Sequence, residues 1–489
     1  MGLTCHAFFD PAMSTLWRSL PSPNELITVL PEHTRGADHD TYLTVVKEPS
    51  EADWLRFESY SRRVRYLDYL LSVEDDDDGS LIPAPRIDWD SVLKYYPPQK
   101  LFPNLLRFNS SSSFGEHWPL FIKPSLRFLS IDIDENEEAL VARCLVECAT
   151  TLKTCSIISR REDTSSTYDI SYAVSSFRSL TQLDVSSLSL LPQALEALSH
   201  LPSLNDLVFG LDIVDNSREQ LPFLSLQLLT VTMRTSNLMV AAFLRRITAP
   251  RLIVLKIYYA AAENPMPVGG ALSPRHRPTA VYVDALLAAA STFSTLQLFM
   301  LHPRPASVGP EHALAPQEIC TASVLRPLLD LHELRVVHMP AIPIILMPSD
   351  IAAFASAWPN VYALVISSDV QHIWSSVQVH DLLPLAQRCA ELGSLALPLA
   401  ITANGGQVPE APPFGGSVAP LHSLYIGSAN VEFSPEAAAY LACMFPDAEL
   451  HTHGEPSPAF ELLKRTKRTV VETMRRQFAY EKQSHGDEQ

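Results

Sequence analysis

The sequence lacks any uninterrupted apolar run long enough to cross a membrane. Its nearest approach, VVHMPAIPIILMP at 336–348, is broken by a histidine and by prolines, whereas a transmembrane helix needs about 20 consecutive apolar residues. The first 30 residues also lack the basic start and the continuous apolar stretch of a secretory signal peptide. We therefore expect no membrane partner.

Basic residues and cysteines are also scarce. Lys and Arg together number 37 against 54 Asp and Glu, which leaves a formal net charge of −17. Because binding to phosphates requires clustered cations, we expect no nucleic-acid partner. The seven cysteines include no Cys-x-x-Cys pair, so we expect a reduced, cytoplasmic or nuclear location. Cys144 and Cys148 are expected to be small buried side chains on one helix face.

Motifs of common active sites are absent as well: no phosphate-binding loop, dinucleotide-binding loop, nucleophile elbow or zinc-protease signature occurs. The segment DIDENEE at 132–138 resembles the start of a calcium-binding loop. However, Glu137 stands where that loop needs glycine, and Arg143 stands where it needs glutamate. His451 and His453 could share a strand face, but no cysteine or carboxylate lies nearby at metal-finger spacing. We therefore expect a chain that is not an enzyme, with no catalytic, cofactor-binding or metal-binding residue.

Glycine numbers only 16 residues against 39 prolines, which predicts many short elements separated by breaks. What the sequence does have is a repeat. About 13 segments share the order apolar-x-x-apolar-x-apolar, as in LRFLSI, LTQLDV and LIVLKI. They begin at Val64, Leu105, Leu126, Leu152, Leu180, Leu204, Leu226, Leu252, Leu296, Leu334, Val361, Leu392 and Leu421.

This repeat predicts the fold. The order L-x-x-L-x-L is the strand signature of leucine-rich repeats, and the text between copies has helical periodicity, as in EEALVARCLVECA before Leu152. One strand and one helix cannot bury their apolar sides alone, so the units must stack. We predict an α/β leucine-rich-repeat solenoid, a ribonuclease-inhibitor-like horseshoe with parallel strands on its concave face, helices on its convex face and a short N-terminal helical segment. The alternative is a doubly wound α/β domain.

Four insertions interrupt the repeat. Residues 72–90, SVEDDDDGSLIPAPRIDWD, contain four consecutive aspartates that repel one another, so we predict a disordered acidic insertion. Residues 260–280, 303–319 and 399–420 each follow the end of a predicted strand. They should therefore project from one rim of the solenoid, either as part of a binding surface or as loops that merely tolerate length.

The variable positions inside each strand should point away from the core, because side chains alternate along a strand. We expect a protein substrate to bind either on the concave face or along the rim formed by the inserted loops. Ordinary surface decoration is the alternative for any single side chain. The candidate residues are Asp132, Asp184, Lys256, Tyr258, Met300, His302, His338 and Tyr425.

The N-terminal segment CHAFFDPAMSTLWRSL resembles the final helix of an F-box domain. The adaptor-binding positions that match are Cys5, Phe8, Leu16 and Trp17, with Pro11, Ala12 and Arg18 in support. The segment PSEADWLRFESYSRRVRYLDYL at 49–70 is similar to the first repeat of a large fungal group of F-box proteins with degenerate leucine-rich repeats. The positions that carry this second match are Trp54, Phe57, Tyr60, Arg63 and Val64.

This resemblance implies a function. In such families the F-box binds a Skp-type adaptor on a cullin scaffold, and the repeats capture a protein for ubiquitination. The chain would then be a substrate-recognition subunit of a cullin-type ubiquitin ligase, and a monomer outside that complex. The first two F-box helices are not found here, so the alternative is a leucine-rich-repeat interaction scaffold without ligase association.

The resemblance, the repeats and the basic tail together predict three parts. Residues 1–31 would be the last F-box helix and a linker, residues 32–455 the solenoid, and residues 456–489 a basic C-terminal helix and tail. This last part would serve as a cap with a solvated face, or as a basic patch for an acidic partner or nuclear import. We expect the first repeats to cover Leu16 and Trp17, and the end of the helix near Phe8 and Phe9 to be poorly packed.

Overall fold

The computed structural model describes the chain in segments that cover most of the repeats. The chain divides into two compact units, Met1–Leu226 and Gln227–Gln489. The described residues are 6–38, 42–69, 73–75, 81–83, 86–111, 114–159, 168–211, 219–233, 237–259, 280–303, 320–340, 342–366, 376–399, 419–426, 434–452 and 457–486.

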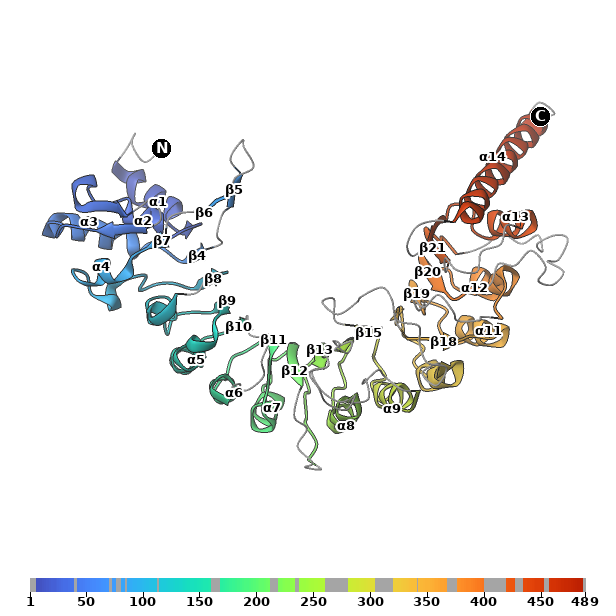
Figure 1. Cartoon of the computed structure of the whole chain (residues 1–489), viewed down its shortest axis with the longest axis horizontal. Helices are drawn as coiled ribbons and strands as arrows, with labels where there is room; N and C mark the ends of the chain where they lie inside the picture. The colour runs from blue at the N-terminus through green and yellow to red at the C-terminus, as the bar shows by residue number, and fades with distance from the viewer. Residues whose placement is uncertain are drawn as a thin grey trace, which may run out of the picture. The chain divides into compact units, whose positions relative to one another are not determined.

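The first unit contains a parallel sheet (Figure 1). In spatial order its strands are β1 (Ser19–Leu20), β4 (Tyr66–Tyr69), β8 (Arg107–Ser110), β9 (Phe128–Ile133), β10 (Thr154–Ser159), β11 (Gln182–Ser189) and β12 (Asp206–Leu211). The longer helices of the unit are α1 (His6–Leu16), α3 (Glu51–Ser61), α5 (Glu138–Glu147), α6 (Tyr168–Ser175) and α7 (Pro192–Ser199). Shorter elements are α2 (Asn24–Ile27), α4 (Trp89–Leu93) and the 3-10 helices η1 (Glu32–Thr34), η2 (Pro98–Lys100), η3 (Gly115–Leu120) and η4 (Glu135–Glu137).

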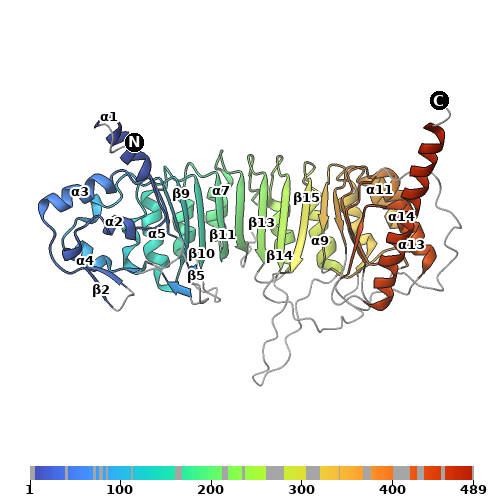
Figure 2. The ribbon, with the colours of Figure 1, turned by 90° about the horizontal axis from the view of Figure 1, so that it is seen from above.

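The second unit repeats this plan, and Figure 2 shows three of its strands, β13, β14 and β15, side by side. Its parallel strands are, in spatial order, β13 (Leu228–Met233), β14 (Val254–Tyr259), β15 (Leu298–Pro303), β17 (Val336–His338), β19 (Ala363–Val365), β20 (Ser394–Leu397), β21 (Ser423–Ile426) and β22 (Glu449–Thr452). A small sheet pairs β16 (Cys320–Thr321) with β18 (Ile344–Ile345). The helical elements are α8 (Asn237–Arg246), α9 (Ala280–Ala290), η7 (Ala322–Leu325), α10 (Arg326–Leu329), α11 (Pro348–Ala357), η8 (Val379–Leu382), α12 (Leu383–Arg388), α13 (Pro435–Met444) and α14 (Pro458–Gly486).

Each unit is an α/β leucine-rich-repeat solenoid, which confirms the predicted fold class. Every predicted repeat contains a sheet strand that begins two residues after its first apolar residue. Within a repeat the first, fourth and sixth positions are buried, as for Leu252, Leu255 and Ile257 around β14. The helices lie on one face of each sheet (Figure 1), whereas a doubly wound domain would carry helices on both. We call the opposite, helix-free face the strand face.

Two strands of the large parallel sheets, one at each end of the repeats, do not belong to any predicted repeat. β1 lies within residues 1–31, ahead of the predicted start of the solenoid, and pairs with β4 through Ser19 and Leu20. At the other end β22 pairs with β21. Both extend the sheet by one strand, and both lack a complete copy of the repeat pattern, which explains why they were missed.

Hydroxyl groups tie neighbouring repeats together at the entry to several strands. A Ser or Thr directly precedes the first apolar residue of the repeat there. Thr151 Oγ1 donates a hydrogen bond to the carbonyl oxygen of Leu126 at 3.0 Å, and Thr295 Oγ1 donates to that of Leu252 at 2.8 Å. These bonds satisfy carbonyl groups at the turn between helix and strand, where no strand partner reaches them.

The acidic segment 72–90 differs from the prediction. Instead of a wholly disordered insertion, β5 (Val73–Asp75) and β6 (Leu81–Pro83) pair antiparallel. β7 (Arg86–Ile87) then joins β3 (Tyr42–Val45), which pairs with β2 (Arg35–Asp38). Asp88 caps α4 by accepting a hydrogen bond from the Ser91 amide. The aspartates at 76–78 and nearly all of the other three insertions lie outside the described residues.

Two smaller expectations concern cysteines and membranes. Cys144 and Cys148 are buried in or beside α5, as predicted. Burial raises the pKa of the Cys144 thiol to about 11 and that of Cys148 to about 12, so both remain protonated at neutral pH. Among the described helices, none combines the length and hydropathy that a bilayer span requires.

The basic C-terminal helix α14 closes the second unit through a buried lysine. Phe460, Leu463 and Lys467 lie on its buried side. Lys467 Nζ donates hydrogen bonds to the carbonyl oxygens of Pro446 at 3.2 Å and Ala448 at 2.7 Å, between α13 and β22. Burial lowers the pKa of Lys467 to about 8, because the ammonium group has lost most of its water.

The lowered pKa predicts a pH dependence of stability. Between pH 8 and 10 the unfolded chain binds more protons at this lysine than the folded chain, so the free energy of unfolding rises with pH. We expect the gain of the wild type relative to Lys467→Met to be about 1 to 2 kcal/mol over that range. Urea unfolding followed by circular dichroism at both pH values measures it. Lys464→Met replaces a half-buried lysine one turn before Lys467 and should follow the wild type; identical slopes for all three proteins would contradict the prediction.

Candidate functional site

The eight side chains predicted for the concave face all project from the strand face. Each is half-buried, and each directly follows a buried core residue of its strand. Asp132 and Asp184 belong to the first unit, and the other six belong to the second. The sequence therefore predicts their orientation correctly; their role in binding a partner stays a prediction.

Three neighbouring strands of the second unit bring five of these residues together. The register places Lys256 of β14, Met300 of β15 and His338 of β17 in one row across the sheet. Tyr258 and His302 form the next row. The ring centroids of His302 and His338 lie 4.2 Å apart, and those of Tyr258 and His302 lie 6.1 Å apart. The result is a small aromatic cluster beside one lysine.

The two histidines form a hydrogen-bonded pair through His302 Nε2 and His338 Nδ1. Burial lowers the pKa of His302. Burial and the neighbouring His302 lower the pKa of His338 to about 4. At neutral pH both rings are therefore uncharged, and one can donate to the other. Among the described residues, no hydrogen bond joins either ring to a Ser, Thr or Cys side chain of the kind that a nucleophile–base pair requires.

A row of apolar residues that was not predicted from the sequence lies beside this cluster. It occupies the third position of consecutive repeats, one variable position ahead of Lys256, and every member is half-buried on the strand face. The sequence does contain an indication of this row, because these apolar residues stand at positions that the repeat pattern does not require to be apolar. The row consists of Leu228, Val254, Leu298, Val336 and Ala363, which follow one another in register.

The strand face of the first unit has a different character. In the equivalent row Thr154 Oγ1 lies 3.4 Å from Gln182 Oε1, and Gln182 Nε2 donates to Asp206 Oδ2 at 2.9 Å. The sheet strands β13 to β21 of the second unit contain no Asp or Glu. The strand face of the first unit thus carries carboxylates at Asp68, Asp132, Asp184 and Asp206. It also carries Arg107, which pairs with Asp68, and two exposed apolar side chains, Phe128 and Ile158.

Tyr425, the remaining predicted residue, lies nearer the end of the second unit. Its ring stacks on that of His451 with centroids 4.9 Å apart. His451 Nε2 also lies 3.8 Å from Glu449 Oε2. The other histidine of that sequence pair, His453, lies outside the described residues. Tyr425 is therefore a stacked surface residue, separate from the cluster around His302.

The prediction of how the N-terminal helix α1 packs is confirmed for some of its residues and wrong for one. Phe8 is 57% and Phe9 42% exposed, which confirms that this end is poorly packed. The ring of Trp17 packs in a tilted arrangement against that of Tyr60 of α3, with centroids 4.4 Å apart, as the prediction of cover by the first repeats requires. Leu16, however, is 69% exposed, so that prediction is wrong for Leu16.

The reason for this error is helical phase. Consecutive helical residues point about 100° apart, so Leu16 faces away when its neighbour Trp17 faces α3. An ion pair between Asp10 and Arg63 holds the same side of α1 against α3. Cys5, the fourth predicted adaptor-binding residue, lies outside the described residues.

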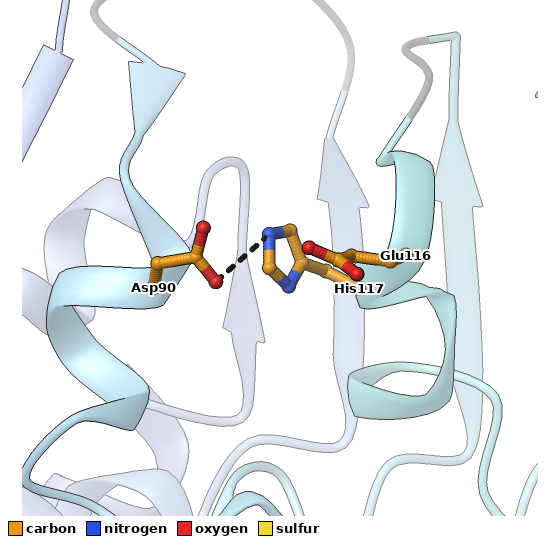
Figure 3. A group of neighbouring side chains, drawn as sticks. All are labelled: Asp90, Glu116 and His117. Atoms are coloured by element: carbon orange, nitrogen blue, oxygen red, sulfur yellow. Dashed lines mark ion pairs between the residues drawn. The ribbon is translucent and has the colours of Figure 1, made fainter.

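A separate cluster combines two carboxylates and one imidazole (Figure 3). Asp90 belongs to the first turn of α4, and Glu116 and His117 belong to η3. His117 Nε2 lies 3.8 Å from Asp90 Oδ1, and one ligand atom of each residue lies within 4.8 Å of the other two. These donors could hold a divalent cation. This cluster could not be predicted from the sequence, because Asp90 lies 26 residues before Glu116.

Comparisons with known proteins add little to this description. No protein-family model matches the sequence, and no curated protein matches it. One similar solved structure is titled "Crystal structure of TLR13-ssRNA13 complex", with 14% sequence identity and a TM-score of 0.34. The match covers 81% of this chain and 53% of that chain, so this chain spans about half the length of the matched receptor. The fold assignment therefore rests on the strand register.

The histidine pair allows a direct check of the site. We expect the ring of His338 to titrate near pH 4 rather than near 6.5, because burial and its neighbour both disfavour the imidazolium form. In His302→Ala the pKa of His338 should rise, since one neighbour and part of the burial are lost. NMR of the ring C–H signals, assigned with a His338→Gln variant, measures both values. An unshifted His338 in the wild type would contradict the described packing.

Proposed function

We propose that the chain is a non-catalytic, protein-binding repeat protein whose partner binds the strand face of the second unit. The observation that carries this proposal is the apolar row from Leu228 to Ala363 beside the Tyr258, Met300, His302 and His338 cluster. Contiguous apolar side chains on a protein surface mark an interaction site more often than chance. Tyrosine and methionine are also enriched at protein interfaces.

The charges on the strand face of the second unit indicate which chemical groups a partner would present there. Lys256 lies between the apolar row and the aromatic cluster, and the sheet strands β13 to β21 contribute no carboxylate. We propose that the partner presents apolar side chains with an acidic group that faces Lys256. The carboxylates on the strand face of the first unit would repel the acidic group of such a partner, which favours the second unit.

Site-specific photocrosslinking tests the location. A benzoylphenylalanine at Met300 should crosslink the partner, which is then identified and purified. The matched control is the same residue at Ala288, which is exposed on α9 of the same repeat. Crosslinks from Ala288 but not from Met300 would place the partner on the helix side and contradict the proposal.

Binding of the purified partner tests the residues. The double variant Lys256→Glu, Tyr258→Ala should bind at least tenfold more weakly, because it loses an aromatic contact and reverses the only charge of the cluster. Its melting temperature should match that of the wild type. Asp184→Asn, on the strand face of the first unit, should bind normally. A fall in melting temperature of the double variant would mean that these side chains are structural.

A second proposal follows from α1. We propose that its exposed side binds a Skp-type adaptor, which would make the chain the substrate-recognition subunit of a cullin-type ubiquitin ligase. Phe9, Met13 and Leu16 recur at helical spacing. The Trp17–Tyr60 and Asp10–Arg63 contacts fix the helix so that Phe9 and Leu16 are exposed and Met13 is half-buried. An amphipathic helix with an uncovered apolar side suits docking to another helical protein.

Biolayer interferometry with a purified Skp-type adaptor tests this second proposal. We expect the full chain to bind, and Phe9→Asp with Leu16→Asp to abolish binding. Ser14→Asp introduces the same charge on the other side of α1 and serves as the matched control. If the wild-type chain does not bind the adaptor, the ligase role is rejected and a scaffold without ligase association remains.

A further inference from the structure

The cluster of Asp90, Glu116 and His117 offers three donor atoms to one point in space. The residues come from two elements, α4 and η3, that are distant in sequence (Figure 3). Two ligands bound to one zinc ion at about 2.0 to 2.1 Å lie roughly 3.4 Å apart in tetrahedral geometry. The observed 3.8 Å between His117 Nε2 and Asp90 Oδ1 is close to that separation. Both carboxylates are exposed and can rotate to close the remaining gap.

The backbone beneath the cluster is fixed by buried aromatic residues. Trp89, directly before Asp90, is buried and packs edge-on against Phe121 with centroids 5.3 Å apart. Trp118, directly after His117, is fully buried and packs against Phe114 at 5.2 Å. The donors are therefore set by the core and not by a loose surface loop. Such prior positioning reduces the entropy that a ligand must overcome.

The charge of the cluster is not neutralised by the protein. Among the described residues, no lysine or arginine forms an ion pair with Asp90 or Glu116. Elsewhere in the same unit carboxylates have such partners, as Glu58 has in Arg62 and Lys100. With a neutral imidazole the cluster carries two negative charges. A divalent cation would balance them.

We propose that Asp90, Glu116 and His117 form a Zn²⁺ site, which goes beyond the proposed function in partner binding. One imidazole and two carboxylates suit Zn²⁺, whereas Mg²⁺ and Ca²⁺ favour sets made only of oxygen ligands. Water would complete the coordination. The ion would bridge α4 and η3 and so join neighbouring repeats of the first unit.

The test uses the full chain, freed of metal with a chelator and titrated with ZnCl₂ by isothermal calorimetry. We expect one equivalent of Zn²⁺ to bind and to raise the melting temperature. Mg²⁺ and Ca²⁺ should do neither. Binding should weaken at least tenfold in His117→Ala and in the conservative variant Asp90→Asn. Both variants should have the metal-free melting temperature of the wild type, and if His117→Ala does not fold, Asp90→Asn with Glu116→Gln carries the test.

A control variant distinguishes Zn²⁺ binding by this cluster from Zn²⁺ binding by the histidine pair His302–His338. His302→Gln with His338→Gln should bind Zn²⁺ as the wild type does, because those residues belong to the second unit. Zn²⁺ binding that is lost in this control but retained in His117→Ala would overturn the proposal. Binding of several equivalents with no effect of any of the three substitutions would do the same, and so would no binding at all.

Discussion

The stacking of leucine columns between repeats is the interaction on which the rest of the structure depends. A single strand and helix bury too little apolar surface to fold alone, so each repeat completes the core of its neighbour. Leu252, Leu255 and Ile257 around β14 are fully buried for this reason. Since side chains alternate along a strand, burying these positions sends the third, fifth and seventh positions to the strand face. The surface available for binding is therefore a direct consequence of the core.

The two units use these free positions differently. In the first unit they carry carboxylates and amides that bond to one another, as Gln182 does to Asp206. In the second they carry an apolar row and a cluster in which two uncharged histidines share a hydrogen bond. The same backbone plan thus presents several carboxylates in one unit and a row of half-buried apolar side chains in the other. This contrast, rather than the fold, supports a specific partner and a specific place for it.

The ends of the chain are closed by different means. At the start, α1 is held on one side by Trp17 and Asp10, which leaves Phe9 and Leu16 uncovered. At the end, α14 covers the last repeats with Phe460 and Leu463 and places Lys467 on two backbone carbonyl groups. Helix α14 buries Phe460, Leu463 and Val471 within the chain, whereas α1 leaves Phe9 and Leu16 exposed. A binding role therefore fits α1 better than α14.

The sequence by itself determined the repeat, the strands, and the face on which Lys256 or His302 lies, because alternation along a strand is a property of adjacent residues. It could not determine which side chains meet across strands. His302 and His338 are 36 residues apart, and Asp90 meets His117 across a similar gap, so lateral register and helix packing decide both contacts. The exposure of Leu16 was likewise decided by packing, because its neighbour Trp17 contacts Tyr60. The local sequence pattern determines on which face of a strand a side chain lies, whereas the residues that it contacts depend on the tertiary structure.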